Sequence, residues 1–285
     1  MNNSKMRSYY RADPKNDTYR VHHGLGIAGN PTMHRMFLAC LVSFACLWFP
    51  TRALAIGPVK ALEFDGVNDY VSAASSPLLK STTAMTIELW AYRETWSAPA
   101  ATNTFISCTQ TGGYNLTLST AGYLRAAVRV NGVYRTPQVD VSGLAPGWHH
   151  LVFSFNTSGQ WLYVDGVLRA SDNGAGVITY DIDNSIQIGA EASGGTTPEG
   201  PYFEGKMDEI RVWTVVRTAQ QIRENMHLTL AGTEADLGAY LRCDLGSGTG
   251  LLDSSGNNNH AFSGADITMP AWIDSTIPLA AGTSH

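Results

Sequence analysis

The feature that most constrains the fold is a recurring pattern of short apolar and polar alternations separated by Gly, Asn, Asp and Pro. Successive side chains of a strand point to opposite faces, so alternation over about four to eight residues predicts a strand with one buried face. Helical periodicity is nearly absent, and many short strands between turn residues predict an all-β sandwich or barrel. The expected strands lie at residues 86–92, 114–118, 124–130, 148–155, 161–164, 185–189, 207–213 and 239–242.

Two dipeptides predict tight hairpin turns. Asn131-Gly132 and Asp165-Gly166 each stand between β-branched residues. Type I′ turns need positive φ at both central positions, which Asn, Asp and Gly tolerate. One short helix is expected near residues 218–226, because Thr218 is followed three residues later by Gln, the spacing of a capping box.

The N-terminal segment is not expected to belong to this fold. Residues 36–49 form an apolar run of 14 without charge, and Ala53 and Ala55 follow at the spacing that a signal peptidase accepts. This arrangement is typical of a secretory signal peptide, so we expect cleavage after Ala55 and a secreted, extracellular or cell-surface product. A membrane anchor is the alternative, but such a run spans only about 21 Å of a hydrocarbon core about 30 Å thick. The start codon is one of three methionines, Met1, Met33 or Met36.

The remaining chain, residues 56–285, shows no internal repeat and no long linker, so we expect one domain after an N-terminal extension plus signal peptide at residues 1–55. The first 55 residues hold seven basic and two acidic side chains, which leaves 12 of the 19 basic and 22 of the 24 acidic residues for the domain. Nucleic-acid binding requires the opposite sign of charge, so nucleic acid is excluded as a partner. No second apolar run of membrane length follows, so no membrane span is expected in the mature chain.

Two cysteines, Cys108 and Cys243, remain after the expected cleavage. In an exported protein they could form one disulfide, or they could be two buried thiols that behave as small hydrophobic residues. Both alternatives stay open at the level of sequence.

Catalytic motifs are missing from the sequence. A retaining glycosidase needs two carboxyl groups about 5 Å apart, which alternate positions on one strand can supply. Asp208 and Glu209 are adjacent, so on a regular strand they would face opposite ways, and Asp181 with Asp183 lies in a stretch typical of a loop. The same parity argument predicts one inward-facing structural histidine rather than a zinc pair at His149-His150. We therefore expect no enzyme activity.

Calcium is compatible with the sequence. It takes six to eight oxygen ligands, many of them loop carbonyls, so its sequence signals are diffuse. The segment at residues 65–69, Asp-Gly-Val-Asn-Asp, offers three oxygen-bearing side chains around a glycine. An Asx turn between two strands is the alternative interpretation of the same segment.

Several segments together resemble the laminin-G-like, concanavalin-A-like jelly-roll family of secreted and surface proteins. The chain is similar to this family over about residues 61–275. The segments that carry the resemblance are residues 61–71 (ALEFDGVNDYV), 85–90 (MTIELW), 148–152 (WHHLV), 162–166 (LYVDG), 203–213 (FEGKMDEIRVW) and 246–257 (GSGTGLLDSSGN).

The resemblance implies a two-sheet antiparallel jelly-roll sandwich with a cation near the strand that carries Asp-Glu-Ile-Arg-Val-Trp. It makes Asp208 the expected side-chain ligand of a structural calcium ion, with Asp65 and Gly66 in the other segment expected to meet it. A shared ion would link segments more than 140 positions apart in the sequence.

The family's members mostly bind glycans or proteins, or act as structural modules in adhesins. We therefore expect a secreted, non-enzymatic binding module for carbohydrate or a surface polymer, with a glycan or a surface protein as partner. The alternatives are a structural or adhesive module without a glycan site and a glycoside hydrolase with dispersed catalytic residues. Fold alone does not choose among these functions. The aromatic residues that could form a glycan platform are Trp96, Tyr114, Tyr180 and Tyr202.

Overall fold

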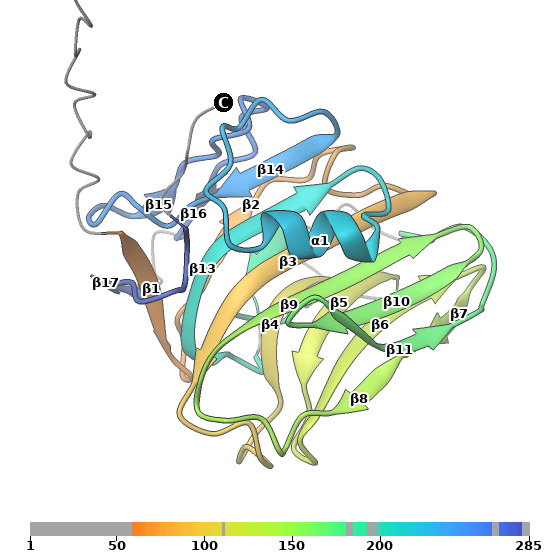
Figure 1. Cartoon of the computed structure of the whole chain (residues 1–285), viewed down its shortest axis with the longest axis horizontal. Coiled ribbons are helices and arrows are strands. Elements are labelled where there is room, and N and C mark those ends of the chain that lie inside the picture. Colours follow the sequence, from red (N-terminus) through yellow and green to blue (C-terminus); the bar gives the residue numbers. More distant parts are fainter. Residues whose placement is uncertain are drawn as a thin grey trace, which may run out of the picture. The chain divides into compact units, whose positions relative to one another are not determined.

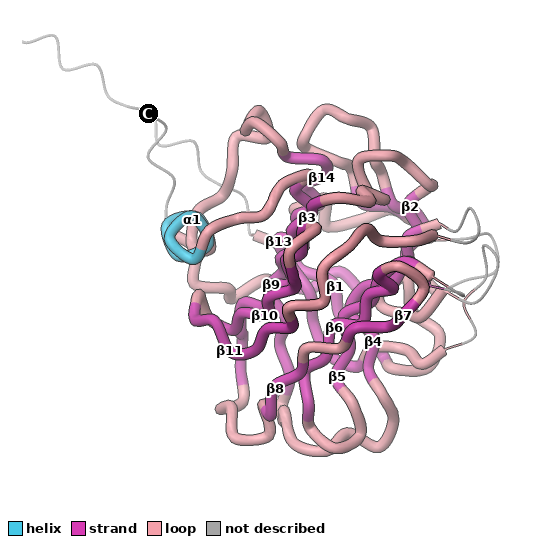
Figure 2. The backbone as a smooth tube through the Cα atoms, turned by 90° about the vertical axis from the view of Figure 1, so that its right-hand side faces the viewer, coloured by secondary structure: helices cyan, strands magenta, loops and turns pink. Residues whose placement is uncertain are grey.

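The computed structural model describes residues 59–109, 112–180, 185–192, 198, 200–263 and 268–280. The expected signal segment and its cleavage site after Ala55 lie outside these residues, as do Asp181 and Asp183. Within the described residues the strands form two antiparallel sheets, here called sheet A and sheet B, that pack as two layers (Figure 1, Figure 2). The expected antiparallel β-sandwich is confirmed.

Sheet A has eight strands among the described residues, in the order β11-β10-β9-β3-β13-β1-β17, with β14 also paired to β13. Their bounds are β1 Lys60–Asp65, β3 Ala84–Arg93, β9 Gly147–Asn156, β10 Gly159–Val164, β11 Val167–Asp172, β13 Glu204–Trp213, β14 Leu237–Leu241 and β17 Ala271–Asp274. The first strand, β1, therefore lies between the late strands β13 and β17.

Sheet B has nine strands among the described residues, in the order β15-β16-β2-β12-β4-β5-β6-β7, with β8 also paired to β6. Their bounds are β2 Val71–Ala73, β4 Asn103–Thr109, β5 Gly113–Leu118, β6 Tyr123–Val130, β7 Val133–Arg135, β8 Gln138–Asp140, β12 Ile186–Ile188, β15 Gly250–Leu251 and β16 Ala261–Phe262.

The main core lies between the sheets and follows the period of two. In β3, Ile87 and Leu89 belong to this core, whereas Glu88 and Trp90 alternate with them on the outer face of sheet A. All four are at most 3% exposed. Sheet A is therefore covered on both faces over this stretch, which requires a further layer outside the sandwich.

That layer begins with the helix α1 (Ala219–Asn225), which lies across sheet A in Figure 1. The expected capping box is present: the Gln221 backbone N–H donates to the Thr218 hydroxyl, and the Gln221 side chain accepts from the Thr218 N–H. Ile222 is the buried residue of α1 and packs against Val152 and Tyr163 of β9 and β10. No helix in the described part of the chain has the length and apolarity needed to cross a membrane.

The C-terminal segment completes this cover. The Ser275 N–H donates to the Val59 carbonyl, and the Ala280 N–H donates to the His227 carbonyl. Residues 275–280 therefore run from the start of β1 to the segment that follows α1. Together, α1 and the C-terminal segment cover part of the outer face of sheet A.

Both expected hairpin turns are confirmed. Asn131 and Gly132 have φ values of 49° and 81°, and Asp165 and Gly166 have 51° and 72°. These are the positive values that a type I′ turn requires at its two central positions.

Of the two alternatives for the cysteines, the disulfide is not formed. Cys108 in β4 and Cys243 after β14 are both buried thiols. Both side chains belong to the main core, so the alternative of two buried thiols describes them.

The turn between β10 and β11 is held by a histidine–carboxylate pair. His149 Nδ1 lies 2.7 Å from Asp165 Oδ2, and His149 Nε2 lies 3.1 Å from the Ala145 carbonyl. Both ring nitrogens face acceptors, so the protonated imidazolium satisfies both contacts. The hydrogen bond to Asp165 is the main reason that the pKa of His149 is raised above its usual value.

We expect the free energy of unfolding to fall as the pH rises through the pKa of His149. The folded pKa lies above the unfolded value, so the stabilisation is complete below about pH 6.5 and is lost at higher pH. His149→Gln removes this contribution, and other titrating groups contribute equally to both proteins. Urea unfolding at about pH 6 and pH 9 should therefore give a difference between wild type and variant that shrinks at pH 9. A difference that does not change with pH would show that His149 is neutral in the folded protein.

Candidate functional site

The expected calcium ligands Asp65 and Asp208 are not brought together. Asp65 pairs with Glu204 across β1 and β13, and Asp208 lies four residues further along β13. At about 3.4 Å per residue, this register separates the two positions by about 14 Å. One ion therefore cannot be held by both carboxylates in this arrangement.

Asp65 and Gly66 form the turn that follows β1. Asp65 Oδ1 accepts hydrogen bonds from the N–H groups of Val67 and Asn68, at 2.8 and 3.3 Å, and Gly66 has a φ of 77°. Asp69 Oδ2 accepts from the Asp65 N–H at 2.9 Å. The Asx turn is thus present, and calcium binding at Asp65 stays a prediction.

Asp208 is 0% exposed. Its Oδ1 accepts from the Glu209 N–H at 2.8 Å, and its Oδ2 accepts from the Ser275 hydroxyl at 2.6 Å. Burial raises the pKa of Asp208 to about 8, and the nearby carboxylates of Glu209 and Asp244 add to the shift. The neutral carboxyl that this pKa favours is a poorer ligand for a hard cation than the ionised carboxylate.

The expectation that Asp208 and Glu209 face opposite ways is wrong, because β13 contains a bulge. Asp208 pairs with Trp90 and Arg211 pairs with Glu88, so three steps along β13 match two along β3. The extra residue is accommodated by Glu209, whose φ is 51°. Such a bulge interrupts the alternation and turns the Glu209 side chain toward the outer face, where Asp208 also lies.

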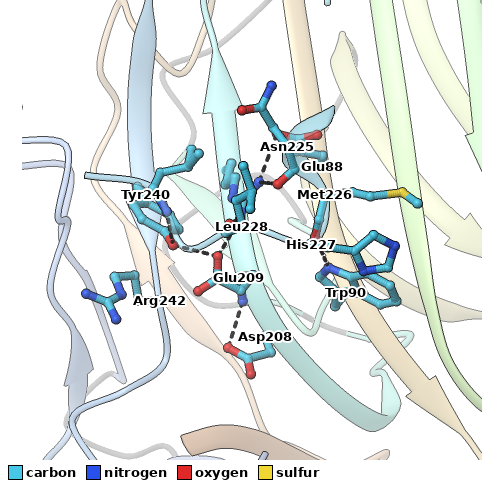
Figure 3. Close-up of polar contacts among 12 residues, drawn as sticks. Glu88, Trp90, Asp208, Glu209, Asn225, Met226, His227, Leu228, Tyr240 and Arg242 are labelled. Carbon is cyan, nitrogen blue, oxygen red and sulfur yellow. Dashed lines mark hydrogen bonds and ion pairs between the residues drawn. The ribbon is translucent and has the colours of Figure 1, made fainter. Parts of the chain in front are cut away.

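A buried polar layer, which includes Glu88, Glu209 and Tyr240, lies between sheet A and its outer cover (Figure 3). Arg211 is the centre of this layer by its contacts. Its Nη2 donates to Glu209 Oε2 at 2.6 Å and to the Leu228 carbonyl at 2.5 Å, and its Nη1 donates to the Asn225 carbonyl at 3.1 Å. The Tyr240 hydroxyl donates to the same Glu209 oxygen at 2.5 Å. The guanidinium thereby joins β13, β14 and the segment after α1.

These contacts also terminate α1. The last carbonyls of a helix have no partner within it. Arg211 binds the Asn225 carbonyl, and Trp90 Nε1 donates to the Met226 carbonyl at 2.8 Å. Because the C-terminal end of a helix carries partial negative charge, a cation there is favourable.

The charges in the layer compensate one another. Arg211 Nη1 lies 3.6 Å from Glu88 Oε1, and Trp213 Nε1 donates to that oxygen at 2.7 Å. Burial lowers the pKa of Arg211, but the Glu88 and Glu209 carboxylates outweigh this and hold it above its usual value. Burial lowers the pKa of His150 to about 4, so this ring is neutral at pH 7.

This layer is structural rather than a ligand site. Asp208, Glu209 and Arg211 are each at most 1% exposed, so a dissolved ligand has no access to them. Within the described ranges, no three His, Cys, Asp or Glu side chains are grouped so that they could hold a metal ion.

An open pocket lies at the other end of the same strands. It has a volume of about 440 Å³ and is bordered by the ends of β1, β3 and β13; we call it the β1–β13 pocket. Its size falls within the range of small-molecule sites. Five of its lining residues are acidic, and they are Glu63, Asp65, Asp69, Glu94 and Glu204.

A cross-strand row of side chains forms one wall of this pocket. Glu63 pairs with Lys206, Lys206 pairs with Tyr92, and Tyr92 pairs with Trp148 of β9. Lys206 Nζ lies 4.7 Å from the centre of the Tyr92 ring and 3.8 Å from Glu63 Oε1. Trp148 packs edge-on against Tyr92, with 5.6 Å between ring centres. The pocket therefore presents a half-buried aromatic ring beside charged hydrogen-bonding groups.

The aromatic residues expected from the sequence do not form this wall. Trp96 and Tyr114 are fully buried in the main core, whereas Tyr180 and Tyr202 are half-buried and do not line the pocket. The orientation of Tyr92 could be predicted from the sequence. Leu89 and Ala91 point into the core, so Tyr92, which follows Ala91 on the same strand, must point to the opposite face. What the sequence does not show is the register that places Tyr92 beside Lys206.

We expect Arg211→Met to lower the free energy of unfolding by about 3–5 kcal/mol, because it leaves two carboxylates buried without their cation. The control is Arg169→Met, since Arg169 is exposed on β11, and this change should stay within about 0.5 kcal/mol. Urea unfolding at neutral pH measures both. An Arg211→Met loss no larger than that of the control would show that the layer does not depend on the guanidinium.

The chain is similar to a known protein family and to several solved structures. The family model of the concanavalin A-like lectin/glucanases superfamily matches residues 65–223. A solved structure from Bacteroides ovatus ATCC 8483, to which carbohydrate binding is provisionally assigned, has a TM-score of 0.60 and 23% identity. The match covers 78% of this chain and 61% of that one, so this chain spans about three fifths of its length.

A heptameric SAP-like pentraxin from Limulus polyphemus matches with a TM-score of 0.45 and 15% identity, over 58% of this chain and 81% of that one. No curated protein matches in sequence. The family match extends over more than half of the sequence, and the observed sandwich agrees with it. The chain belongs to the concanavalin A-like lectin/glucanase superfamily.

Proposed function

We propose that the protein is a non-enzymatic carbohydrate-binding module and that its ligand occupies the β1–β13 pocket. The observation that carries this proposal is the row of Glu63, Lys206 and Tyr92 along one wall of an open pocket. The superfamily to which the chain belongs and the assignment given to the Bacteroides ovatus protein support it. The signal-like segment before Ala55 supports action outside the cytoplasm.

The wall has the chemistry that a sugar requires. A sugar ring has an apolar face of C–H groups, which packs on an aromatic ring, and an edge of hydroxyl groups. Tyr92 supplies the aromatic surface and is braced by Trp148. The carboxylates of Glu63 and Glu94 accept hydrogen bonds from hydroxyl groups, and Lys206 donates them.

Tyr92 is held in a defined orientation. Its hydroxyl donates to Glu94 Oε1 at 2.9 Å, and the ammonium of Lys206 lies over its ring. A ring that is already fixed loses little conformational entropy when a ligand stacks on it. Tyr92 is therefore expected to contribute more affinity than a freely rotating surface tyrosine.

We expect Tyr92→Ala to weaken glycan binding by about tenfold or more, equivalent to about 1.4 kcal/mol. A glycan array first identifies a ligand, and calorimetry then compares the variants. The matched control is Tyr123→Ala, an exposed tyrosine on β6 of the other sheet, which should leave the affinity unchanged. Equal losses in both variants would show that the ligand does not bind at Tyr92.

The proposal also predicts that the protein does not cleave its ligand. The bound oligosaccharide should be recovered intact, and reproducible release of reducing sugar would reverse the non-enzymatic assignment.

Stabilisation by calcium is a separate proposal. We expect chelation to lower the melting temperature and restored calcium to raise it by several degrees, because an ion that binds only the folded state stabilises it by mass action. Since Asp65 and Asp208 lie apart, Asp65→Asn and Asp208→Asn tested separately identify which carboxylate responds. Asp274→Asn is the control, as its side chain is 75% exposed. A melting curve that is the same in chelator and in calcium would show that no structural calcium ion stabilises the protein.

A further inference from the structure

The β1–β13 pocket is strongly acidic, although it contains two cations. Of these, Arg93 is only 5% exposed and donates to the Asn103 side chain and to the carbonyls of Glu204 and Thr95. The guanidinium of Arg93 is therefore held by hydrogen bonds within the pocket wall. Lys206 lies over Tyr92 and pairs with Glu63. Glu204 forms an ion pair with Arg93. Three further carboxylates, Asp65, Asp69 and Glu94, also line the pocket, so its acidic side chains outnumber its two cations.

One of these carboxylates has an unused acceptor. Asp69 is 4% exposed, and its Oδ2 accepts from the Asp65 N–H. Its Oδ1 is buried and has no hydrogen-bond partner among the described residues. A buried carboxylate oxygen without a donor is costly. Asp69 lines the pocket, so a ligand bound there can supply the donor that the protein does not.

The side chain of Glu204 lies in the same region and is open to solvent. It is 69% exposed, and its Oε2 forms an ion pair with Arg93 Nη2 at 3.7 Å, which exposure to water weakens. Glu204 pairs with Asp65 in the register of β1 and β13, and both line the pocket. A donor group that enters beside the Tyr92 wall therefore meets several carboxylates from different strands.

We propose that the pocket selects sugars that carry a positively charged amine, such as oligomers of glucosamine, over neutral sugars and uronic acids. This inference rests on the proposed carbohydrate-binding function and names its ligand class. An ammonium group has three N–H donors and makes charge-assisted hydrogen bonds to carboxylates. A uronate would instead place its carboxylate among the five acidic side chains of the pocket, and like charges repel. The domain's excess of acidic residues favours the approach of a cationic polymer.

The test compares three hexasaccharides by calorimetry with the purified protein. The probes are the glucosamine hexamer, its fully N-acetylated form and the galacturonate hexamer, at about pH 6, low salt and with EDTA present. We expect the glucosamine hexamer to bind at least tenfold more tightly than the N-acetylated hexamer, and galacturonate to bind least. The preference should shrink in high salt, because salt screens exposed charges.

Two variants test which carboxylates produce the preference for glucosamine. Glu204→Gln and Asp69→Asn keep the shape of each side chain and remove its charge. Each should weaken glucosamine binding by about fivefold and leave the N-acetylated hexamer within about twofold. Glu204 is the safer variant for folding, since it is largely exposed. The control is Glu224→Gln on α1, an exposed carboxylate outside the pocket, which should change neither affinity.

The outcomes separate this inference from the function on which it rests. If none of the three sugars nor any neutral glycan binds, both the function and the selectivity are wrong. If the N-acetylated or galacturonate hexamer binds as tightly as the glucosamine hexamer, carbohydrate binding stands and the charge selectivity is overturned. Binding of glucosamine only after calcium is added would also overturn it, because the carboxylates would then hold a metal ion rather than the amine.

Discussion

The packing of α1 against the outer face of sheet A depends on one buried cation. Arg211 neutralises two carboxylates and binds two carbonyls at the end of α1, so it is the point at which helix and sheet meet. A buried ion pair adds little net stability compared with apolar packing, but removing one partner is costly. The layer therefore fixes where α1 sits more than it strengthens the fold. α1 and the C-terminal segment cover the part of sheet A around Arg211, and the pocket lies at the other end of β1, β3 and β13.

The parts of the fold that could be predicted from the sequence are those with local causes. The capping box at Thr218 and the two type I′ turns depend on the residues at those positions, and alternation gives the long strands such as β3 and β9. Strands of two or three residues, such as β2 and β15, are too short to show a period. The bulge at Glu209 is also invisible, because a single extra residue is specified by the contacts of its side chain with Arg211 and Tyr240.

Only one segment of the candidate site could be predicted from the sequence. The segment around Asp65 was recognised as rich in oxygen ligands, and it does line the pocket. Its expected partner Asp208 lies further along β13 because register, which sequence alone does not specify, decides which residues of two strands are neighbours. The same register brings Tyr92, Lys206 and Glu63 into one row. These three residues come from three different strands, and none belongs to a motif that indicates sugar binding.

The position of β1 between two late strands has a consequence for how the domain can be excised. β1 lies between β13 and β17, and β14 pairs with β13 as well. A fragment cut at the limits of the family match, residues 65–223, would lack β1, β14 and β17 together with the C-terminal segment. One edge of β13 would then present unpaired backbone groups, which invite edge-to-edge aggregation. The smallest fragment expected to avoid this aggregation runs from β1 to the C-terminal segment, well beyond the C-terminal limit of the family match at residue 223.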